Sequence, residues 1–567
     1  MLLIHAQHLT QRVRHVIDAH GNNSHLAIQS DDWLTIMYTR AWAEFISGDL
    51  RVLYRAPTYV MNEIVRRRDD FLSDHWLRVA HKLAGPYLIA RCRRGEVEVA
   101  RSLYRGQDLF YSTIDSTIAF STKPSWLLRL TDSGTHEIDG EYCRRFIVDT
   151  PEFSNATPLQ RVKSISLGQA VHSDLRALTP LPAHVPVPNG EDVVPLLSER
   201  LACITKQFER TSLSFSGGLD SSALLYCLTK AGTNFVATHA LSSLPYADTE
   251  LAEATRIAKS LRAEIQIQRM NEDSPSPFQP HLFKTPVFSS PFDVDIFSPA
   301  PPAENLAVLG TAEIPRELIL TGHGGDHVFL QNPGRNVAFD PLLKLNIVGA
   351  FSEVRRYCRL KKDNIYAAMV SNLKLLFRGK NHLAALLHTP TWLPSASTSK
   401  SRPEHHLLSG LDPRTAKHAH VRAILLALHT ISPPRAEGAT VLHPLLLPEV
   451  IGTVLHRPVS ELYSSEHDRV VLRNSVFRAS RHDFSWRRSK RSSSAGLFKY
   501  FQDNQEILHQ WLSAGILVRA LGIDTEQLRK SISVNGQAYL NEDFPALINI
   551  IQLELFLQSM LTQPAAG

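Results

Sequence analysis

Short apolar segments separated by turn residues dominate the first third of the chain. The segments GPYLIARCRRGEVEVARSLY (85–104) and LFYSTIDSTIAFST (109–122) alternate apolar with polar positions, and Gly or Asp interrupts each of them. A period of two, with many Tyr, Ile, Phe and Thr, is typical of β-strands joined by tight turns. We therefore predict a β-rich domain with a few helices over residues 1–180.

A proline-rich stretch, Thr179–Val193, follows this region. Successive prolines favour an extended backbone and exclude both helix and central strand. We therefore expect a linker at residues 181–192 and a second large domain at 193–567. We find no internal repeat.

The second domain alternates buried strands with amphipathic helices. Strands are predicted at 211–216, 234–241 and 265–270, and helices at 197–208, 221–232 and 248–264. Strand–helix alternation at this spacing indicates a doubly wound α/β fold with a parallel sheet. A further strand and turn lie in ELILTGHGGD (317–326). The Pro-, Ser- and Phe-rich stretch Asp273–Pro302 predicts a long ordered loop, and the chain beyond residue 326 is predicted to be mainly helical.

Composition narrows the class of protein without revealing its chemistry. The 567 residues are 43% hydrophobic and 20% charged, which excludes a disordered, collagenous or coiled-coil protein. Neither a membrane span nor a secretory signal is predicted, and five scattered cysteines favour a reducing cytoplasm over a disulfide framework. Sixty-one basic against 55 acidic residues give a net charge of +6, which permits an anionic ligand but does not require nucleic acid.

The first chemical motif is SFSGGLDSSALL, Ser214 to Leu225, where a predicted strand runs directly into a helix. Glycines let the backbone approach a ligand, and the free N–H groups of the first helical turn bind phosphate. Because Asp220 would repel phosphate unless a cation lay between them, we predict that it is a Mg²⁺ ligand. The alternative is a Gly-Gly turn without a ligand. The motif is not a Walker A loop, since GxxxxGK[ST] is absent.

The second motif is ELILTGHGGDHVFL, Glu317 to Leu330. Asp326 follows a buried strand, and ligands of open parallel sheets sit at the carboxyl ends of strands. We therefore predict that Asp326 shares the Mg²⁺ with Asp220. Two alternatives remain open. His323 and His327 could form a zinc pair, although Gly324-Gly325 between them argues against a regular helix, or both histidines could simply cap a turn.

Together these motifs resemble a known family. SGGLDSS followed by GHGGDH is similar to the ATP pyrophosphatase domain of the asparagine synthetase family, and residues 1–180 resemble its glutaminase domain in LAGPYLIARC and ARSLYRGQDLFYS. The resemblance implies an N-terminal-nucleophile-like domain followed by an ATP-dependent synthetase with ATP and Mg²⁺ as cofactors. The residues that it assigns to the nucleotide are Ser214, Ser216, Gly217, Gly218, Asp220, Ser221, Ser222 and Gly322.

The sequence departs from the family in an informative way. Glutaminases of this family use a cysteine at position 2 as the nucleophile, whereas this chain begins Met1-Leu2-Leu3 and has no cysteine before Cys92. We therefore expect an inactive glutaminase-like domain and an amine supplied by the substrate. Two branches fit: β-lactam-type synthetases and lasso-peptide cyclases. The form GHGGDH, together with AHVRAILLA, HPLLLPEVI and WRRSK, is similar to the cyclases.

The same resemblance suggests catalytic residues. It places the catalytic lysine at Lys490 in WRRSK, where its charge would stabilise the adenylation transition state; the alternative is a solvated basic stretch. It pairs His323 with an acid near Glu353 as the base for the attacking amine, although a lone Glu on an amphipathic helix is more often solvated. Arg473, in VVLRNSVF, is interpreted as structural.

These features predict a lasso-peptide cyclase. It would adenylate a side-chain carboxylate of a precursor peptide and join it to the N-terminal amine, beside a peptidase that removes the leader. Residues Phe278–Phe297 are a candidate peptide-contacting wall, with surface-loop packing as the alternative. The rival functions are a small-molecule amide or β-lactam synthetase, a tRNA-modifying ATP pyrophosphatase, and a non-catalytic scaffold.

Overall fold

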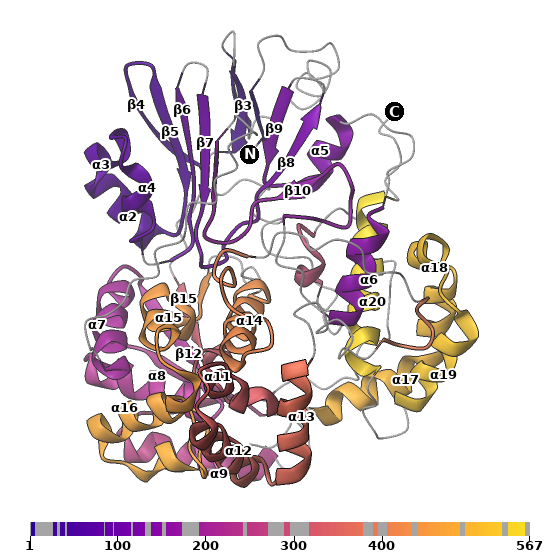
Figure 1. Ribbon diagram of the computed structural model, residues 1–567. Helices are drawn as coiled ribbons and strands as arrows, with labels where there is room; N and C mark the ends of the chain where they lie inside the picture. The colour runs from indigo at the N-terminus through magenta and orange to yellow at the C-terminus, as the bar shows by residue number, and fades with distance from the viewer. Residues whose placement is uncertain are drawn as a thin grey trace.

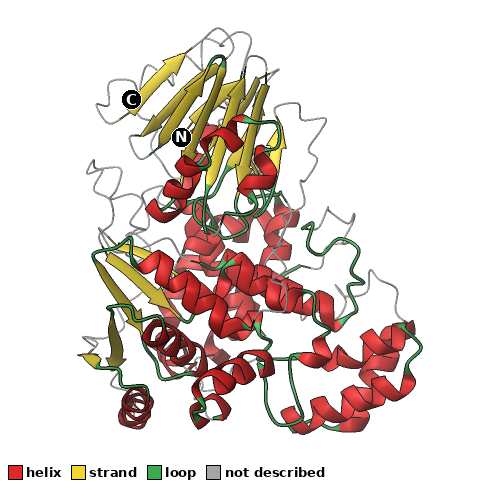
Figure 2. Cartoon of the chain, turned by 90° about the vertical axis from the view of Figure 1, so that its left-hand side faces the viewer, coloured by secondary structure: helices red, strands yellow, loops and turns green. Residues whose placement is uncertain are grey.

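The computed structural model has two parts, a pair of antiparallel sheets at one end and a parallel sheet surrounded by helices at the other (Figures 1 and 2). It describes residues 2–5, 26–30, 34–39, 42–83, 85–93, 96–114, 117–130, 138–149, 155–172, 192–241, 247–269, 288–294, 317–377, 389–394, 405–431, 439–487, 494–535 and 543–561.

The N-terminal part contains a six-stranded and a five-stranded antiparallel sheet. The first has the order β10-β8-β9-β1-β3-β2 and the second β11-β7-β6-β5-β4. Their strands are β1 (Leu2–His5), β2 (Leu26–Ser30), β3 (Leu34–Thr39), β4 (Ala43–Ser47), β5 (Leu50–Arg55), β6 (Leu88–Arg93), β7 (Glu96–Arg101), β8 (Phe110–Ile114), β9 (Thr117–Ser121), β10 (Lys163–Ser164) and β11 (Ala170–His172). The two segments predicted to be strand pairs form β6–β7 and β8–β9.

Alternate side chains along β6 point to opposite faces of its sheet and belong to two different apolar clusters. Leu88, Ala90 and Cys92 of β6 pack with Tyr111 and Phe120 of the other sheet. The intervening Ile89 belongs instead to the apolar cluster that includes the short helices α2 (Thr58–Arg66), α3 (Arg68–Leu72) and α4 (Trp76–Ala80). Strand β6 is therefore covered on both faces.

The second part is built on a five-stranded sheet with all neighbours parallel, in the order β14-β13-β12-β15-β16. Its strands are β12 (Arg210–Ser214), β13 (Val236–Leu241), β14 (Ile265–Arg269), β15 (Glu317–Thr321) and β16 (Ala439–Leu442). Helices α7 (Val193–Thr205), α8 (Leu219–Lys230) and α9 (Ala247–Ser260) match the predicted ones. The doubly wound fold is confirmed. Strand β16 was not predicted, because it is a four-residue strand in a region that otherwise reads as helical.

The remaining elements are helical. They are α5 (Pro124–Leu130), α6 (Gly140–Asp149), α10 (Gly325–Val328), α11 (Phe339–Leu343), α12 (Ile347–Lys361), α13 (Ile365–Phe377), α14 (Ala416–His429), α15 (Pro448–Leu455), α16 (Val470–Ser480), α17 (Ser494–Ser513), α18 (Ile516–Leu521), α19 (Thr525–Asn535), α20 (Phe544–Leu561) and the 3₁₀ turns η3 (Pro291–Asp293), η6 (Arg335–Ala338), η8 (Pro444–Leu446), η9 (Val459–Glu461) and η10 (Asp483–Trp486).

The two parts share a core. Helix α20 packs on α6, and Asn549 donates from Nδ2 to the backbone carbonyl oxygens of Phe146 and Ile147 at 3.1 Å each. By length and composition α20 alone among the described helices could cross a membrane, but 72% of that window is buried inside the protein, as in a core helix. The predicted linker, apart from Asp192, lies outside the described residues, so the domain boundary stays a prediction.

Candidate active site

Strands β12 and β15 bring the two sequence motifs to one edge of the sheet. Ser214 and Thr321 are paired in register at the ends of these parallel strands. The chain leaves β12 for β13 on one side, whereas β15 lies on the other side, so the order reverses here. A crevice at such a reversal is where open α/β sheets bind ligands.

The loop after β12 is shaped by its serines and glycines. Ser216 Oγ lies 3.1 Å from Ser221 Oγ and accepts from the Gly218 N–H at 3.3 Å. Gly217 has φ of +73°, and a Cβ there would lie 3.0 Å from the Cβ of Ala254, so only glycine fits. No side chain caps α8, which leaves the N–H groups of its first turn available to an anion.

The GHGGDH segment lies directly against this loop. A Cβ on Gly322 would come within 2.9 Å of the Ser221 backbone nitrogen, and one on Gly325 within 2.5 Å of Asp220 Oδ1. Gly324 between them has φ of +86° and is the residue immediately before α10. Glycines at these positions therefore let the two motifs touch, and Asp220 faces the residue that precedes Asp326.

Asp220 is buried and forms an ion pair that the sequence did not reveal. Arg469 Nη1 donates to Asp220 Oδ2 at 2.7 Å, and its Nε donates to Asp468 Oδ1 at 3.2 Å. Burial lowers the pKa of Arg469, but Asp220 and Asp468 outweigh it and raise that pKa overall. Arg469 has φ of +50° immediately before α16, a conformation that local sequence patterns do not predict.

Asp326 has a more open position than Asp220. About a third of its side chain (35%) is exposed, and its Oδ1 lies 3.1 Å from His327 Nδ1. Carboxylate oxygens on adjoining backbone segments suit a hard divalent cation such as Mg²⁺. The described residues contain no cluster of three or more His, Cys, Asp or Glu side chains arranged to hold a metal, so both the Mg²⁺ site and its zinc alternative stay predictions.

His323, in the GHGGDH segment, lies against the first residue of the HPLLLP segment. Its ring centroid is 5.0 Å from that of His443, and the backbone of Ala427 in α14 is a hydrogen-bond partner of its ring. Desolvation lowers the pKa of His323, as does His327, whereas Asp326 opposes the shift. The imidazole is therefore neutral near pH 7, the state that a proton acceptor requires.

Glu353 has partners other than the predicted one. It is buried on α12, where it accepts from the Tyr463 hydroxyl at 2.7 Å and pairs with Arg356 at 3.1 Å. Among the described contacts none joins it to His323. The sequence indicated a solvated position as the alternative, and burial excludes that alternative. The role of Glu353 as an orienting acid stays a prediction.

Lys490 lies outside the described residues, but the chain leading to it is held firmly. Arg473 Nη1 donates to the carbonyl oxygens of Ser485 and Arg487, at 2.6 and 3.0 Å, and Arg487 pairs with Glu253 of α9 at 3.3 Å. These contacts agree with the structural interpretation of Arg473.

The cysteines of the N-terminal part are poorly placed to act as nucleophiles. Cys92 and Cys143 are buried, and burial raises the pKa of the Cys92 thiol to about 12. A thiol that stays protonated at neutral pH is a poor nucleophile.

Comparison of the sequence with known proteins shows which family the chain belongs to. The asparagine synthase family model matches residues 195–558, and the chain belongs to that family. It is therefore an ATP-dependent ligase that forms an amide bond, as predicted. The chain is also 21% identical over 484 residues to the microcin J25-processing protein McjC of Escherichia coli, covering 85% of this chain and 87% of that protein.

Proposed function

We propose that this ligase is a lasso-peptide cyclase that closes a macrolactam in a precursor peptide. The contact between the SGGLDSS loop and the GHGGDH segment carries the proposal, because it joins an anion site to two carboxylates and a neutral imidazole. The similarity to a microcin J25-processing protein over most of both chains supports a peptide as the substrate. Processing of that kind also fits a peptidase partner that removes the leader.

In the first step the side-chain carboxylate of a substrate Asp or Glu attacks the α-phosphorus of ATP. The new O–P bond forms as the bond between the α-phosphorus and the bridging oxygen breaks, so pyrophosphate departs and the acyl adenylate stays bound. The first-turn N–H groups of α8 and the hydroxyls of Ser216 and Ser221 would bind the phosphates. Asp220 and Asp326 would hold Mg²⁺, which would offset phosphate charge. Lys490 would stabilise the transition state.

In the second step the N-terminal amine of the peptide attacks the activated carbonyl carbon, AMP leaves, and an isopeptide bond closes the ring. His323 would accept the proton that the amine loses, since its lowered pKa keeps it neutral. The Ala427 backbone, which is a partner of the ring, would fix its orientation.

The test incubates the full chain with ATP and leaderless precursor peptides. The expected products are AMP, pyrophosphate and a peptide lighter by one water. Release of ADP, or AMP release without a cyclic product from any peptide, would contradict the proposal. Two substrate controls separate the steps: replacing the acceptor Asp or Glu by its amide should stop AMP release, and acetylating the N-terminus should stop only ring closure.

A further inference from the structure

The loop between β7 and β8 (residues 102–109) reaches from the N-terminal part of the chain into the part built on the parallel sheet. Most of its residues are buried, among them Tyr104 and Arg105, which are only 2% and 4% exposed. Gly106 fixes the path of the loop, because a Cβ there would collide with the side chain of Pro86. The proposed function gives Tyr104 and Arg105 no role, although two buried polar side chains require partners.

Tyr104 holds the first residue of the HPLLLP segment. The backbone N–H of His443 donates to the Tyr104 hydroxyl oxygen at 2.8 Å, and both residues are buried. His443 directly follows β16, and its Nδ1 lies 2.5 Å from Oγ1 of Thr321 at the end of the neighbouring β15. Thr321 Oγ1 also accepts from the His323 backbone N–H at 3.2 Å. Because the rings of His443 and His323 lie 5.0 Å apart, Tyr104 fixes the residue against which the His323 imidazole packs.

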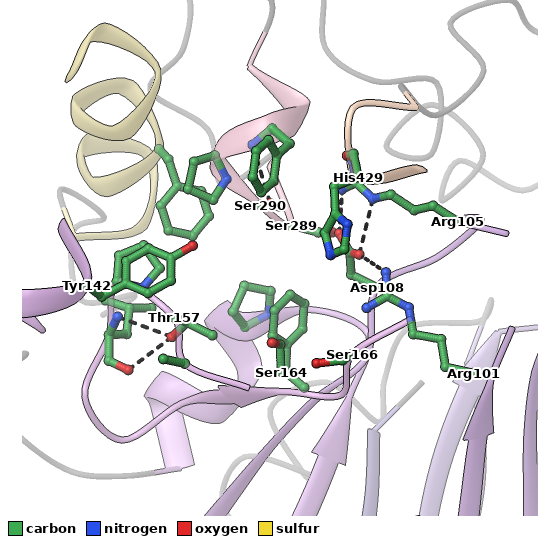
Figure 3. A pocket seen from close by; sticks show the side chains of 18 residues that line it. Arg101, Arg105, Asp108, Tyr142, Thr157, Ser164, Ser166, Ser289, Ser290 and His429 are labelled. Carbon is green, nitrogen blue, oxygen red and sulfur yellow. Dashed lines mark hydrogen bonds and ion pairs between the residues drawn. The ribbon is translucent and has the colours of Figure 1, made fainter. Parts of the chain in front are cut away.

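Arg105 caps the carboxyl end of α14 (Figure 3). Its Nη1 donates to the backbone carbonyl oxygens of His429 at 2.6 Å and of Ile431 at 3.1 Å. The last four carbonyl groups of a helix have no partner within it, and a cation beside them is favourable. The rest of the guanidinium pairs with Asp108 and with Asp293, which belongs to the candidate peptide-contacting wall. A lysine could not replace this arginine, since one ammonium group cannot span carbonyls and carboxylates on opposite sides.

The His323 ring bonds to the same end of α14. Desolvation lowers the pKa of His323 overall, and the hydrogen bond to the backbone of Ala427 acts in the opposite direction. A bond that favours the protonated ring is one in which a ring N–H donates and the carbonyl oxygen accepts. The other nitrogen of the neutral imidazole then carries no proton. The Ala427 carbonyl, two residues before the one that Arg105 holds at His429, therefore selects the tautomer that can accept a proton.

We propose that Tyr104 and Arg105 are positioning residues for His323 and act in ring closure. Their role rests on the proposed function, in which His323 accepts the proton of the attacking amine. Tyr104 holds His443 against the His323 ring, and Arg105 holds the helix end that accepts from the ring N–H. The glutaminase-like region, which has no cysteine at position 2, thereby contributes to the second step of the synthetase.

The experiment compares Tyr104→Phe with Tyr226→Phe in the full chain. Each variant loses one hydroxyl that bonds to the backbone, and the Tyr226 hydroxyl, which donates to the Ala479 carbonyl oxygen at 2.7 Å, joins α8 to α16. With leaderless precursor peptides, ATP–pyrophosphate exchange measures adenylation and mass spectrometry measures ring formation. We expect Tyr104→Phe to keep exchange within about twofold of the wild type and to lower the kcat of ring formation about tenfold, with an unchanged KM for peptide. Tyr226→Phe should match the wild type in both steps.

Hydroxylamine supplies a rescue, because it is neutral near pH 7 and attacks an acyl adenylate without the help of a base. Tyr104→Phe should therefore form the peptide hydroxamate at the wild-type rate while ring formation stays slow. Arg105→Lys, which keeps the charge but not the fork of donors, should show the same separation of the two steps. Normal ring formation in Tyr104→Phe, or an equal loss of both steps, would overturn the proposal.

A spectroscopic measurement separates the positioning of His323 from the proposed function. Nitrogen-15 NMR of histidine-labelled protein reports which ring nitrogen carries the proton, and His323→Gln identifies the signals of His323. We expect one tautomer in the wild type and in Tyr226→Phe, and a mixture of tautomers in Tyr104→Phe. An unchanged tautomer in Tyr104→Phe would overturn the positioning role even if the wild type cyclises peptides. If the tautomer changes but the wild type neither adenylates nor cyclises any peptide, the positioning of His323 stands and the proposed function is wrong.

Discussion

Arg469 donates to Asp220 over 2.7 Å and joins the start of α16 to the start of α8, although 249 residues separate them. Both side chains are buried, so the attraction between them offsets part of the cost of removing each charge from water. Replacing Arg469 by Met should lower the free energy of unfolding by about 3–5 kcal/mol, because the buried Asp220 carboxylate would lose its arginine partner. Urea denaturation measures this. Arg478→Gln, which removes an exposed pair on the same helix, should cost at most about 1 kcal/mol. Equal effects of the two variants would disprove the role of burial.

Gly325 tests the contact between the two motifs. An alanine Cβ would lie 2.5 Å from Asp220 Oδ1 and force the segments apart. We expect AMP release to fall about 100-fold with little change in secondary structure. Gly140→Ala is the control, because its Cβ would meet its nearest neighbour at an ordinary 3.4 Å. A Gly325→Ala enzyme with normal kcat would show that close approach of the motifs is unnecessary.

An Asp326→Asn variant tests whether Asp326 binds Mg²⁺. Asp326→Asn keeps the size of a partly exposed side chain but removes its charge. AMP release should drop by at least about 100-fold and recover partly as Mg²⁺ concentration is raised, since a weakened site needs more cation. Normal pyrophosphate release at low Mg²⁺ would remove Asp326 from the metal site.

Because the protein contains buried histidines, we expect its free energy of unfolding to fall in acid. Burial lowers the pKa of His420 to about 4, and Lys417 acts in the same direction, whereas an unfolded histidine titrates near 6.5. Between these values the unfolded state binds the extra proton, so stability falls as pH falls. The loss is about 2 kcal/mol from His420 at pH 5.

The control for this prediction is His420→Gln, which can still donate to the Val328 carbonyl oxygen but does not titrate. Its free energy of unfolding should change less steeply between pH 6.5 and 5 than that of the wild type. Parallel pH curves would mean that His420 is not responsible.

Cysteine labelling tests the loss of glutaminase chemistry. Cys203 is exposed, whereas Cys92, Cys143, Cys227 and Cys358 are buried. Brief iodoacetamide treatment of the native protein should modify Cys203 alone, as read by peptide mass spectrometry. Glutamine hydrolysis should be absent. Rapid alkylation of Cys92 together with glutaminase activity would contradict this expectation.

The sequence predicted those elements of the fold that depend on neighbouring residues. Strands β12 to β15 and helices α7 to α9 were predictable because burial imposes its period on adjacent residues. Each glycine-rich motif is also a continuous segment that directly follows a predicted strand, and the structure brings the two together at the ends of β12 and β15. The sequence could not reveal that Arg469 pairs with Asp220, or that Glu353 contacts Tyr463 rather than His323, because these contacts join residues 110 or more positions apart. The sequence held one indirect signal for Arg469: a buried carboxylate such as that of Asp220 requires a positively charged partner.

The contact of Asn549 with Phe146 spans 403 residues of chain. At about 5–20 residues per second, a ribosome needs about 20–80 s to make the helix that covers α6 after α6 itself has emerged. During that interval the apolar face of α6, including the side chains of Phe146 and Ile147, lacks its final partner. We therefore expect the nascent N-terminal region to need protection by chaperones, and a chain that stops before α20 to expose the apolar face of α6 and aggregate.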